Sequence, residues 1–259
     1  TKVKLLMKMP GVGKKVKKRI CEQVYQAFGG NLYEVIIGGA ALNQEIESFL
    51  KDIDFPFTVG YGATECAPII TYSDWHDFVP MSCGREVVHM EVKIDSENPE
   101  TVPGEILARG LNVMLGYYKN DEATAQTIDK DGWYHTGDLG LMDKGGNVFI
   151  KGRSKNMLLG PNGQNIYPEE IEDKLNSMTF AMESVVVQRD GKLVGLVHPD
   201  FDEVQAMGLS RDDLQSLMEE NRVQVNANLP VYCKIAAIEI HDEEFEKTPK
   251  KSIKRYLYK

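Results

Sequence analysis

The pattern that most constrains the fold is an apolar strand, a helix and a second apolar strand in close succession. Residues 32–37 form a short apolar run closed by Gly38-Gly39, which is typical of a buried strand in a parallel sheet. Asn43 is placed to cap a helix over residues 44–51, and residues 57–59 form the next apolar run. This alternation of strand and helix predicts an α/β layer.

Two other sequence patterns lie on either side of this layer. Residues 14–28 place apolar side chains at helical spacing between charges, which predicts an amphipathic helix. Residues 87–94, 104–109 and 147–150 read as short strands separated by turn residues, with a short helix at 121–127. The sequence therefore predicts a small β-rich subdomain after the α/β layer.

The last hundred or so residues have the pattern of a compact α+β domain. Residues 152–163 are polar and interrupted by glycines, which favours a linker, and Pro168 then opens a helix. Asp190-Gly191 lies between two apolar runs and predicts a β-hairpin. Ser210 and Asp213 have the spacing of a capping box before a further helix.

Composition narrows the function classes. The chain has 259 residues and a formal net charge of -9, which argues against a general nucleic-acid binder. Its first nineteen residues are basic, through Lys2, Lys4, Lys8, Lys14, Lys15, Lys17, Lys18 and Arg19. A solvated helix face is one interpretation of this stretch, and a membrane-surface patch that collects a lipid substrate is the other. The cysteine spacing favours neither a zinc site nor a disulfide framework, and a reducing cytoplasm is expected.

Three spaced motifs carry the chemistry: Tyr61-Gly62-Ala63-Thr64-Glu65, Tyr134-His135-Thr136-Gly137-Asp138 and Gly152-Arg153. Together they supply a metal-binding carboxylate, a phosphate-facing hydroxyl, a ribose-binding carboxylate and a cation. Those groups can hold ATP while a carboxylic acid attacks its α-phosphate. In this order the motifs resemble the adenylate-forming superfamily of acyl-CoA synthetases, luciferases and peptide-synthetase adenylation domains.

The resemblance implies a role for each motif residue. Glu65 would hold Mg²⁺ and Thr64 would hydrogen-bond the α-phosphate, although Thr-Glu after a strand also serves as a plain helix cap. Tyr61, followed by Gly62, would pack on the adenine, or would simply be buried in the core. Asp138 would accept hydrogen bonds from the ribose hydroxyls. His135 is interpreted as a structural or pocket-edge residue. The segments Gly104-Glu105-Ile106, with Gly110, and Gly116-Tyr117-Tyr118 also resemble the family and are interpreted as structural.

Other positions take their roles from the resemblance alone. The backbone of Gly39, Ala40 and Ala41 would line the adenine pocket. Arg153 would contact the ribose, and Lys155 would be the hinge about which a mobile domain turns. At Gly163 the pantetheine arm of coenzyme A would pass. On this basis residues 1–152 are predicted to be the C-terminal portion of the large AMP-binding domain, and residues 153–259 the small mobile domain.

The sequence departs from the family pattern in two places. Where the family has a lysine that contacts ATP, this chain has Ser252, with Lys251 one position earlier, so Lys251 is predicted to substitute through a slip of the loop. The alternative is an impaired adenylation step, because loss of one such donor would cost about 3 kcal/mol. The family's Ser/Thr/Gly-rich phosphate loop is absent, and the match covers only the C-terminal half of a module. Because the chain starts at Thr1, a fragment is expected.

The resemblance is greatest to long-chain fatty acid–CoA ligases. It implies that ATP activates a fatty acid to an acyl-AMP, which coenzyme A then captures as a thioester, with Mg²⁺ as the metal. One alternative is a fatty acyl-AMP ligase that loads a carrier protein. Another is a nucleotide- or acyl-adenylate-binding module without turnover, which the absent phosphate loop and Ser252 favour.

Overall fold

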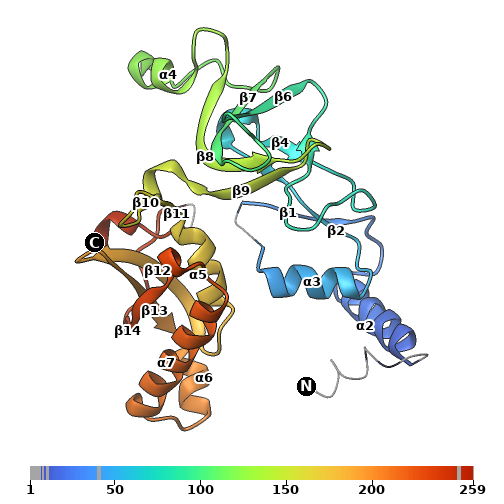
Figure 1. Ribbon diagram of the computed structural model, residues 1–259. Coiled ribbons are helices and arrows are strands. Elements are labelled where there is room, and N and C mark those ends of the chain that lie inside the picture. The colour runs from blue at the N-terminus through green and yellow to red at the C-terminus, as the bar shows by residue number, and fades with distance from the viewer. Residues whose placement is uncertain (1–6, 8, 10–11, 40–41, 250–251, 259) are drawn as a thin grey trace. The chain divides into compact units, whose positions relative to one another are not determined.

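The computed structural model describes residues 7, 9, 12–39, 42–249 and 252–258, and it divides into two compact units, Thr1–Ile150 and Lys151–Lys259. Helices and strands are mixed in both, so the predicted combination of α/β and α+β architecture is confirmed (Figure 1). Within the described residues, no helix is both long enough and apolar enough to cross a membrane.

The first unit begins with the α/β layer. Its elements are α2 (Gly13–Ala27), β1 (Val35–Ile37), α3 (Gln44–Asp52) and β2 (Phe57–Val59). Strands β1 and β2 pair in parallel, as expected for strands joined by a helix. The side chain of Asn43 accepts hydrogen bonds from the first turn of α3 and caps it as predicted. The predicted strand at 32–37 is shorter than expected and starts only at Val35.

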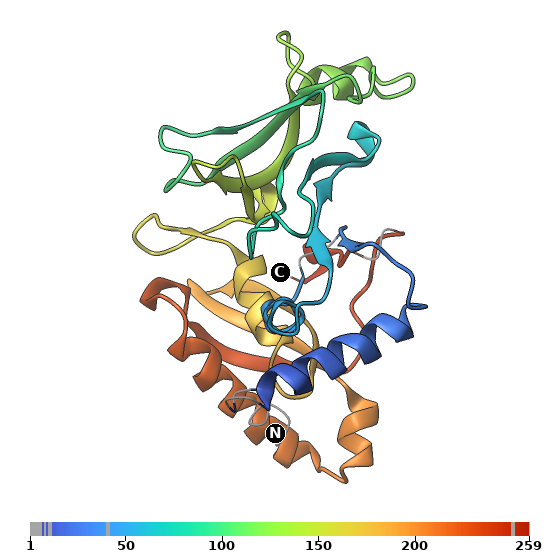
Figure 2. The same ribbon diagram turned by 90° about the vertical axis from the view of Figure 1, so that its right-hand side faces the viewer.

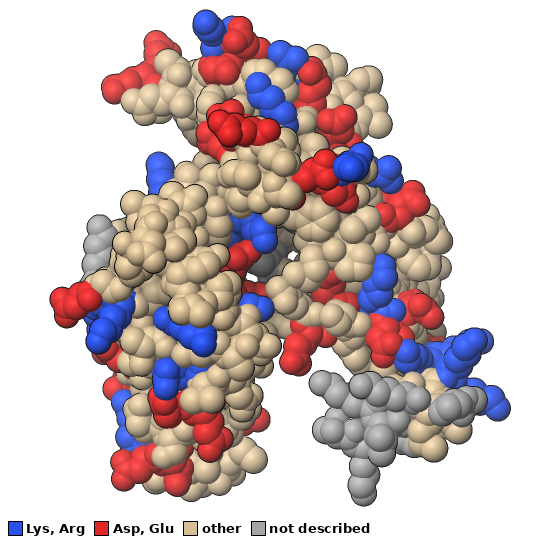
Figure 3. All heavy atoms as spheres, in the orientation of Figure 1, with Lys and Arg blue, Asp and Glu red and all other residues tan. Residues whose placement is uncertain are grey.

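Helix α2 turns its apolar side chains to the core of this unit, where Val16, Ile20 and Val24 pack. Lys17 of the same helix pairs with Asp52 of α3. In Figure 3 Lys and Arg side chains gather at the α2 end, with acidic side chains beside them. The basic stretch therefore has an acidic partner from another element, which its own sequence did not show.

The rest of the first unit is β-rich. A hairpin sheet contains β3 (Tyr61–Gly62), β4 (Ile69–Tyr72) and β5 (Arg85–Glu86), with a 3₁₀ turn at Thr64–Cys66. A four-stranded sheet follows in the order β6 (Met90–Asp95), β7 (Gly104–Gly110), β8 (Tyr134–Met142) and β9 (Val148–Arg153), with α4 (Asp121–Thr127) before β8. The predicted strand at 87–94 is wrong in its first residues, because His89 has a φ of 68° and turns the chain before β6.

The main sheet of the second unit has three strands and carries helices on one face, as Figure 1 and Figure 2 show. Its strands are β12 (Ala181–Arg189), β13 (Lys192–Pro199) and β14 (Ile235–Ile240), and its helices are α5 (Pro168–Asn176), α6 (Phe201–Ala206) and α7 (Arg211–Ala227). Strand β13 is central, antiparallel to β12 and parallel to β14. Leu175 and Met218 of the helices are fully buried beneath the sheet.

Both faces of this sheet are covered. Phe245 and the partly buried Ile253 and Tyr258 pack on side chains from the face opposite α5 and α7. A 3₁₀ turn at Val231–Cys233 precedes β14, and a last one covers Arg255–Leu257. The C-terminal segment is therefore part of the core of this unit.

The predicted linker at 152–163 is more structured than expected. It contains a 3₁₀ turn at Ser154–Asn156 and the antiparallel pair β10 (Leu158–Leu159) and β11 (Asn165–Ile166). Asn156 donates a 2.6 Å hydrogen bond to Glu169 of α5, which ties the turn to the second unit. The polar composition that suggested a linker reflects this short hairpin instead.

Candidate active site

The first predicted motif lies in a tight hairpin between β3 and β4. A Cβ added to Gly62 would come within 2.0 Å of the carbonyl oxygen of Pro68, so only glycine fits there. Ala67, at the end of the 3₁₀ turn, has a φ of 55°. The side-chain amide of Asn112 donates to the carbonyls of Cys66 (2.6 Å) and Ile69 (3.0 Å). The turn that carries Thr64 and Glu65 is thereby braced from both sides.

Glu65 is half-buried and held by two contacts. The hydroxyl of Tyr117 donates a 2.9 Å hydrogen bond to its Oε1, and the amide of Met114 donates to its backbone carbonyl at 2.7 Å. Burial first, and then the hydrogen bond to Glu65, raise the pKa of Tyr117, so this hydroxyl keeps its proton at neutral pH. The carboxylate of Glu65 is therefore oriented by a neutral donor.

The donor set at Glu65 fits one mode of Mg²⁺ binding. Within residues 12–39, 42–249 and 252–258, no three His, Cys, Asp or Glu side chains gather as a metal cage. Mg²⁺ at phosphates is commonly held by one or two carboxylates, with waters and phosphate oxygens completing the octahedron. A single oriented carboxylate suits that arrangement, and Thr64 beside it is exposed.

Asp138 lies on strand β8, at a local irregularity. Glu105 of β7 is opposite Leu139 and Leu107 is opposite His135, so two steps along β7 match four steps along β8. The extra residues form a bulge around Gly137, whose φ is 71°. The sequence predicted the motif but not this strand; the Thr-Gly-Asp triplet is a bulge within a nine-residue strand.

The two motifs meet through a buried hydrogen bond. The hydroxyl of Tyr61 donates to Oδ2 of Asp138 at 2.6 Å, and the two residues are only 9% and 8% exposed. Burial, followed by the neighbouring charge of Asp138, raises the pKa of Tyr61. The phenol is therefore a permanent donor to the carboxylate. The structure thus brings together residues that are 77 positions apart in the sequence.

The glycine segment after β1 lies beside the same hairpin. The amide of Gly60 donates to the carbonyl of Ile37 at 2.9 Å, and a Cβ at Gly38 would lie 3.2 Å from the carbonyl oxygen of Gly60. Gly39 follows with a φ of 86°. The predicted contributions of Ala40 and Ala41 lie outside the described residues.

Three predicted residues, Arg153, Lys155 and Gly163, belong to the start of the second unit. Arg153, at the end of β9, and Lys155, in the following 3₁₀ turn, are both exposed. Gly163 has a φ of 78° in the turn between β10 and β11, and its amide donates to the carbonyl of Gly160 at 2.9 Å. A Cβ at Gly163 would lie more than 4 Å from every described atom. Backbone conformation is therefore a sufficient reason for glycine at this position.

The C-terminal loop that replaces the family's lysine motif is the tip of a small hairpin. Lys247 and Ile253 form an antiparallel bridge, and the amide of Thr248 donates to the carbonyl of Ser252 at 2.8 Å. Ser252 therefore lies at the base of the tip. Lys251, the predicted substitute, lies outside the described residues.

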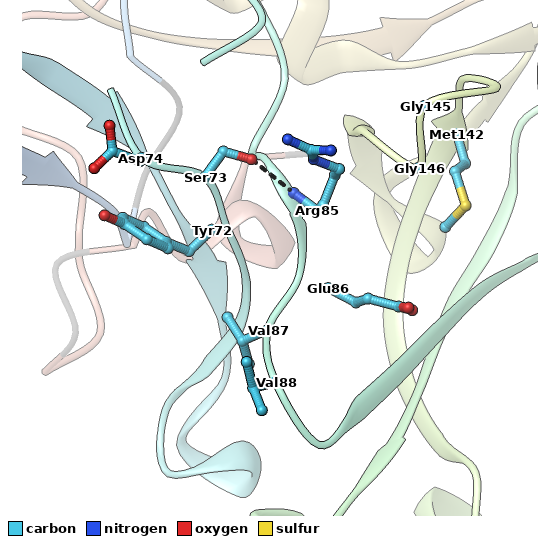
Figure 4. Close-up of a pocket in the computed structure, with 10 residues that line it drawn as sticks. All are labelled: Tyr72, Ser73, Asp74, Arg85, Glu86, Val87, Val88, Met142, Gly145 and Gly146. Carbon is cyan, nitrogen blue, oxygen red and sulfur yellow. Dashed lines mark hydrogen bonds between the residues drawn. The ribbon is translucent and has the colours of Figure 1, made fainter. Parts of the chain in front are cut away.

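A hollow of about 620 Å³ lies elsewhere in the first unit (Figure 4). It is lined by Tyr72, Ser73, Asp74, Arg85, Glu86, Val87, Val88, Met142, Gly145 and Gly146. Hydrogen bonds from the backbone of His76 and from the side chains of Tyr33 and His76 lower the pKa of Asp74 to about 2. None of the motif residues lines this hollow, so it does not bear on the nucleotide site.

Sequence reasoning did not find three residues that orient the motifs: Asn112, Tyr117 and Glu105. Tyr117 and Glu105 belong to segments that resemble the family but were interpreted as structural, and Asn112 was not singled out. Each of these side chains comes from a strand or loop distant in sequence from the motif it contacts, so local residue spacing does not predict the contact. Only the pairing of β7 with β8 brings Glu105 to the bulge.

Several known proteins are similar to this chain in sequence. Residues 3–118 match the family of AMP-binding enzymes. A long-chain-fatty-acid–CoA ligase of Escherichia coli is 37% identical over 178 residues, which cover 66% of this chain and 28% of that protein. The 4-coumarate–CoA ligase 1 of Glycine max is 38% identical over 177 residues, which cover 63% of this chain and 60% of that protein.

Solved structures give the same fold. The O-succinylbenzoate coenzyme A synthetase of Bacillus subtilis, in complex with AMP, superposes with a TM-score of 0.72 at 22% identity, over 95% of this chain and 49% of the other. The anthranilate CoA ligase AuaEII, in complex with anthranoyl-AMP, has a TM-score of 0.73 at 21% identity, over 94% and 48%. The chain thus spans about half of these structures and less than two thirds of the two sequence relatives. Residues 3–118 thus match the family of AMP-binding enzymes, and the solved structures that share the fold are adenylate-forming enzymes.

Proposed function

We propose that the protein activates a long-chain fatty acid with ATP and transfers the acyl group to coenzyme A. In the first step a carboxylate oxygen attacks the α-phosphorus of ATP and pyrophosphate leaves, which forms the acyl-AMP. In the second step the sulfur of coenzyme A attacks the acyl carbon, its proton is lost to solvent and AMP leaves. The observation that carries the proposal is the buried hydrogen bond between Tyr61 and Asp138, which joins the two nucleotide motifs.

In this proposal each motif residue has one task. Asp138 accepts hydrogen bonds from the ribose hydroxyls, and the segment from Gly39 to Ala41 lines the adenine pocket with its backbone. Glu65 holds Mg²⁺, which would neutralise phosphate charge. Thr64, beside it, donates a hydrogen bond to the α-phosphate. Tyr61 acts through Asp138, because its hydroxyl is already committed to that carboxylate.

We assign the second unit to the mobile domain of the family. Arg153 then reaches the ribose, Lys155 is the hinge, and Gly163 lies where the pantetheine arm passes. Lys251 supplies the cation at the phosphates in place of Ser252. Transfer to a carrier protein is the second candidate, and the dependence on coenzyme A separates the two.

The first test is AMP release by the full-length protein from ATP, Mg²⁺ and palmitate, with and without coenzyme A. We expect release to rise with coenzyme A as the thioester forms, and we expect 4-coumarate to be a poorer acid. Release that is indifferent to coenzyme A contradicts the thioester step. The Asp138→Ala variant should bind AMP about 10- to 100-fold more weakly, because a hydrogen bond to a charged group contributes about 1.5–3 kcal/mol. Unchanged AMP affinity would remove the ribose role.

Gly163→Leu tests the coenzyme A site. Its positive φ is strained by any side chain, at a cost of about 1–2 kcal/mol, so stability must be controlled. Gly208→Leu is a matched control, since Gly208 also has a positive φ (66°) and open space around its Cβ. We expect Gly163→Leu to lose thioester formation but keep adenylate formation, and Gly208→Leu to keep both. Equal loss of both steps in Gly163→Leu contradicts the assignment.

Contact with an anionic membrane surface through α2 is a further part of this proposal. Lys14, Lys15, Lys18 and Arg19 are exposed, whereas Lys17 is engaged with Asp52. Each exposed cation near an anionic surface contributes about 1 kcal/mol. Co-sedimentation with phosphatidylserine vesicles should exceed that with phosphatidylcholine vesicles and should fall when Lys14 and Lys18 become Glu. Equal sedimentation with both lipids removes the membrane role.

A further inference from the structure

The bulge that carries Asp138 leaves backbone groups outside the regular ladder. Where two steps of β7 match four of β8, Gly137 and Asp138 lie in the stretch of β8 between the register pairs Glu105–Leu139 and Leu107–His135, outside the regular pairing. Buried or half-buried amides need an acceptor, because an unpaired one costs about 1–3 kcal/mol. The conformation of the bulge therefore depends on what accepts from these two amides.

Two side chains accept from them. Oε1 of Glu105 accepts from the amide of Gly137 at 2.9 Å, and Oγ1 of Thr136 accepts from the amide of Asp138 at 3.0 Å. The Thr136 hydroxyl donates in turn to the carbonyl of Ile106 at 2.7 Å. The bulge is thus attached to β7 by side chains at each of its extra residues.

The second oxygen of Glu105 is also engaged. Its Oε2 lies 2.9 Å from Nδ1 of His135, whose other ring nitrogen lies 3.8 Å from Asp129. Glu105 thereby contacts the bulge at two points, with one carboxylate oxygen at the His135 ring and the other at the Gly137 amide. The side chains of Glu105 and His135 are 27% and 35% exposed, so this brace between the two inner strands is partly accessible to solvent.

We propose that Glu105 is a positioning residue for nucleotide binding, because it fixes the bulge that aims Asp138 at the ribose hydroxyls. The inference rests on the proposed ribose role of Asp138 and goes beyond it, since Glu105 acts only through the backbone of Gly137. From β3, the Tyr61 hydroxyl donates directly to Asp138. Asp138 is consequently oriented by the Tyr61 side chain from β3 and, through the backbone of Gly137, by the Glu105 side chain from β7.

The test is a double-mutant cycle read by calorimetric titration of AMP. Glu105→Ala should weaken AMP about tenfold, the equivalent of one hydrogen bond in its usual range. Glu105→Gln keeps an acceptor for Gly137 and should stay within about threefold. In an Asp138→Ala background, Glu105→Ala should have no further effect. An equal tenfold loss in that background overturns the inference while it leaves the ribose role of Asp138 intact.

The ratio of the affinities for AMP and for a ligand without ribose hydroxyls is a second measure, because a general loss of stability does not change this ratio. Wild-type protein should bind 2′,3′-dideoxy-AMP more weakly than AMP, and Glu105→Ala should lose most of that discrimination. Glu91→Ala is the matched control, because Glu91 lies in the same sheet and pairs with Arg109 away from the bulge. Full discrimination in Glu105→Ala contradicts the inference.

Hydrogen exchange tests the contact between Glu105 and the Gly137 amide directly and does not require nucleotide binding. The amide of Gly137 should exchange at least about tenfold faster in Glu105→Ala than in wild type or Glu91→Ala. Unchanged protection overturns the brace. If Gly137 exchanges faster but Asp138→Ala binds AMP normally, the proposed ribose site fails while the brace itself stands.

Discussion

Asp138 in the first unit and Glu172 in the second are both buried carboxylates, yet their surroundings differ. Asp138 is 8% exposed and accepts from the hydroxyl of Tyr61, a neutral donor on a neighbouring hairpin. Glu172 is 6% exposed and contacts the guanidinium of Arg255 and the amide of Val186. One carboxylate meets a phenol at a bulge, and the other meets a cation at the edge of a sheet.

The difference matches the proposed binding role of Asp138 and a structural role of Glu172. Val186 is on β12, the outer strand of its sheet, so Glu172 covers part of an open edge. Arg255 belongs to the C-terminal segment, and the pair therefore ties that segment to α5 and β12. A buried carboxylate that is paired with a guanidinium stabilises the fold. A buried carboxylate that is oriented by a neutral hydroxyl is suited to binding an uncharged sugar.

The largest expected effect comes from removal of the cation. Arg255→Ala should destabilise the second unit by about 4 kcal/mol at pH 8, because Glu172 is left buried without a countercharge. The loss should be smaller at pH 5, where Glu172 is protonated. Both tryptophans, Trp75 and Trp133, are in the first unit, so hydrogen exchange of Val186 in urea is the appropriate measurement.

Arg211→Ala is the control for that measurement. Arg211 pairs with Asp242, and both side chains are more than half exposed, so the loss should stay below about 1 kcal/mol. Equal effects of the two variants would mean that the Glu172–Arg255 pair is no more important than a surface pair, and the comparison would lose its basis.

The second prediction concerns pH. Burial, which outweighs the opposing effect of Arg255, raises the pKa of Glu172 from 4.5 to about 7. Because the folded-state pKa exceeds the unfolded one, the contribution of this group is full below about pH 4.5 and is lost as pH rises through 7. Relative to Glu172→Gln, wild type should therefore lose about 3 kcal/mol between pH 4.5 and pH 8.

Urea unfolding of the two proteins across that range, followed by far-ultraviolet circular dichroism, checks the sign. The difference is the informative quantity, since exposed acids such as Asp213 and Asp242, whose pKa values are lowered, titrate in both proteins. A gap between the two curves that stays constant with pH would show that Glu172 does not titrate in this window.

The two regions also differ in how far the sequence predicted them. Local chemistry predicted the elements around Glu172 well. Pro168 opens α5, Asp190 and Gly191 both have positive φ in the hairpin, and Ser210 forms the capping box with Asp213. Each of these depends on neighbours within three residues. The ion pair between Glu172 and Arg255 joins residues 83 positions apart, so the local sequence pattern did not predict it.

At the candidate site the sequence identified the residue types and missed their supports. Tyr61, Thr64, Glu65 and Asp138 were all singled out, but the hydroxyl of Tyr61 turned out to bond Asp138. The strand register that produces the bulge depends on how β7 and β8 pair, which periodicity alone does not specify. The identity of a binding group is local information, whereas its orientation is tertiary.

The smallest expected effect is at the neutral partner. Tyr61→Phe removes only the donor to Asp138 and should destabilise the first unit by about 2 kcal/mol, the range for a hydrogen bond to a charged group. Urea unfolding followed by tryptophan fluorescence reports on this unit. Tyr33→Phe is the control, because its hydroxyl donates to Asp74 at 2.7 Å on a ring that is 66% exposed. That variant should lose less than about 1 kcal/mol.

The affinity of Tyr61→Phe for AMP tests the role of this residue more directly than its stability does. If the phenol orients Asp138 for the ribose, AMP should bind about tenfold more weakly, and the variant should discriminate less against 2′,3′-dideoxy-AMP. If stability falls but both affinities stay unchanged, the Tyr61–Asp138 pair is a structural contact like Glu172–Arg255. The distinction between the two carboxylates would then depend on their partners' charge alone, because a neutral donor would no longer imply a binding role.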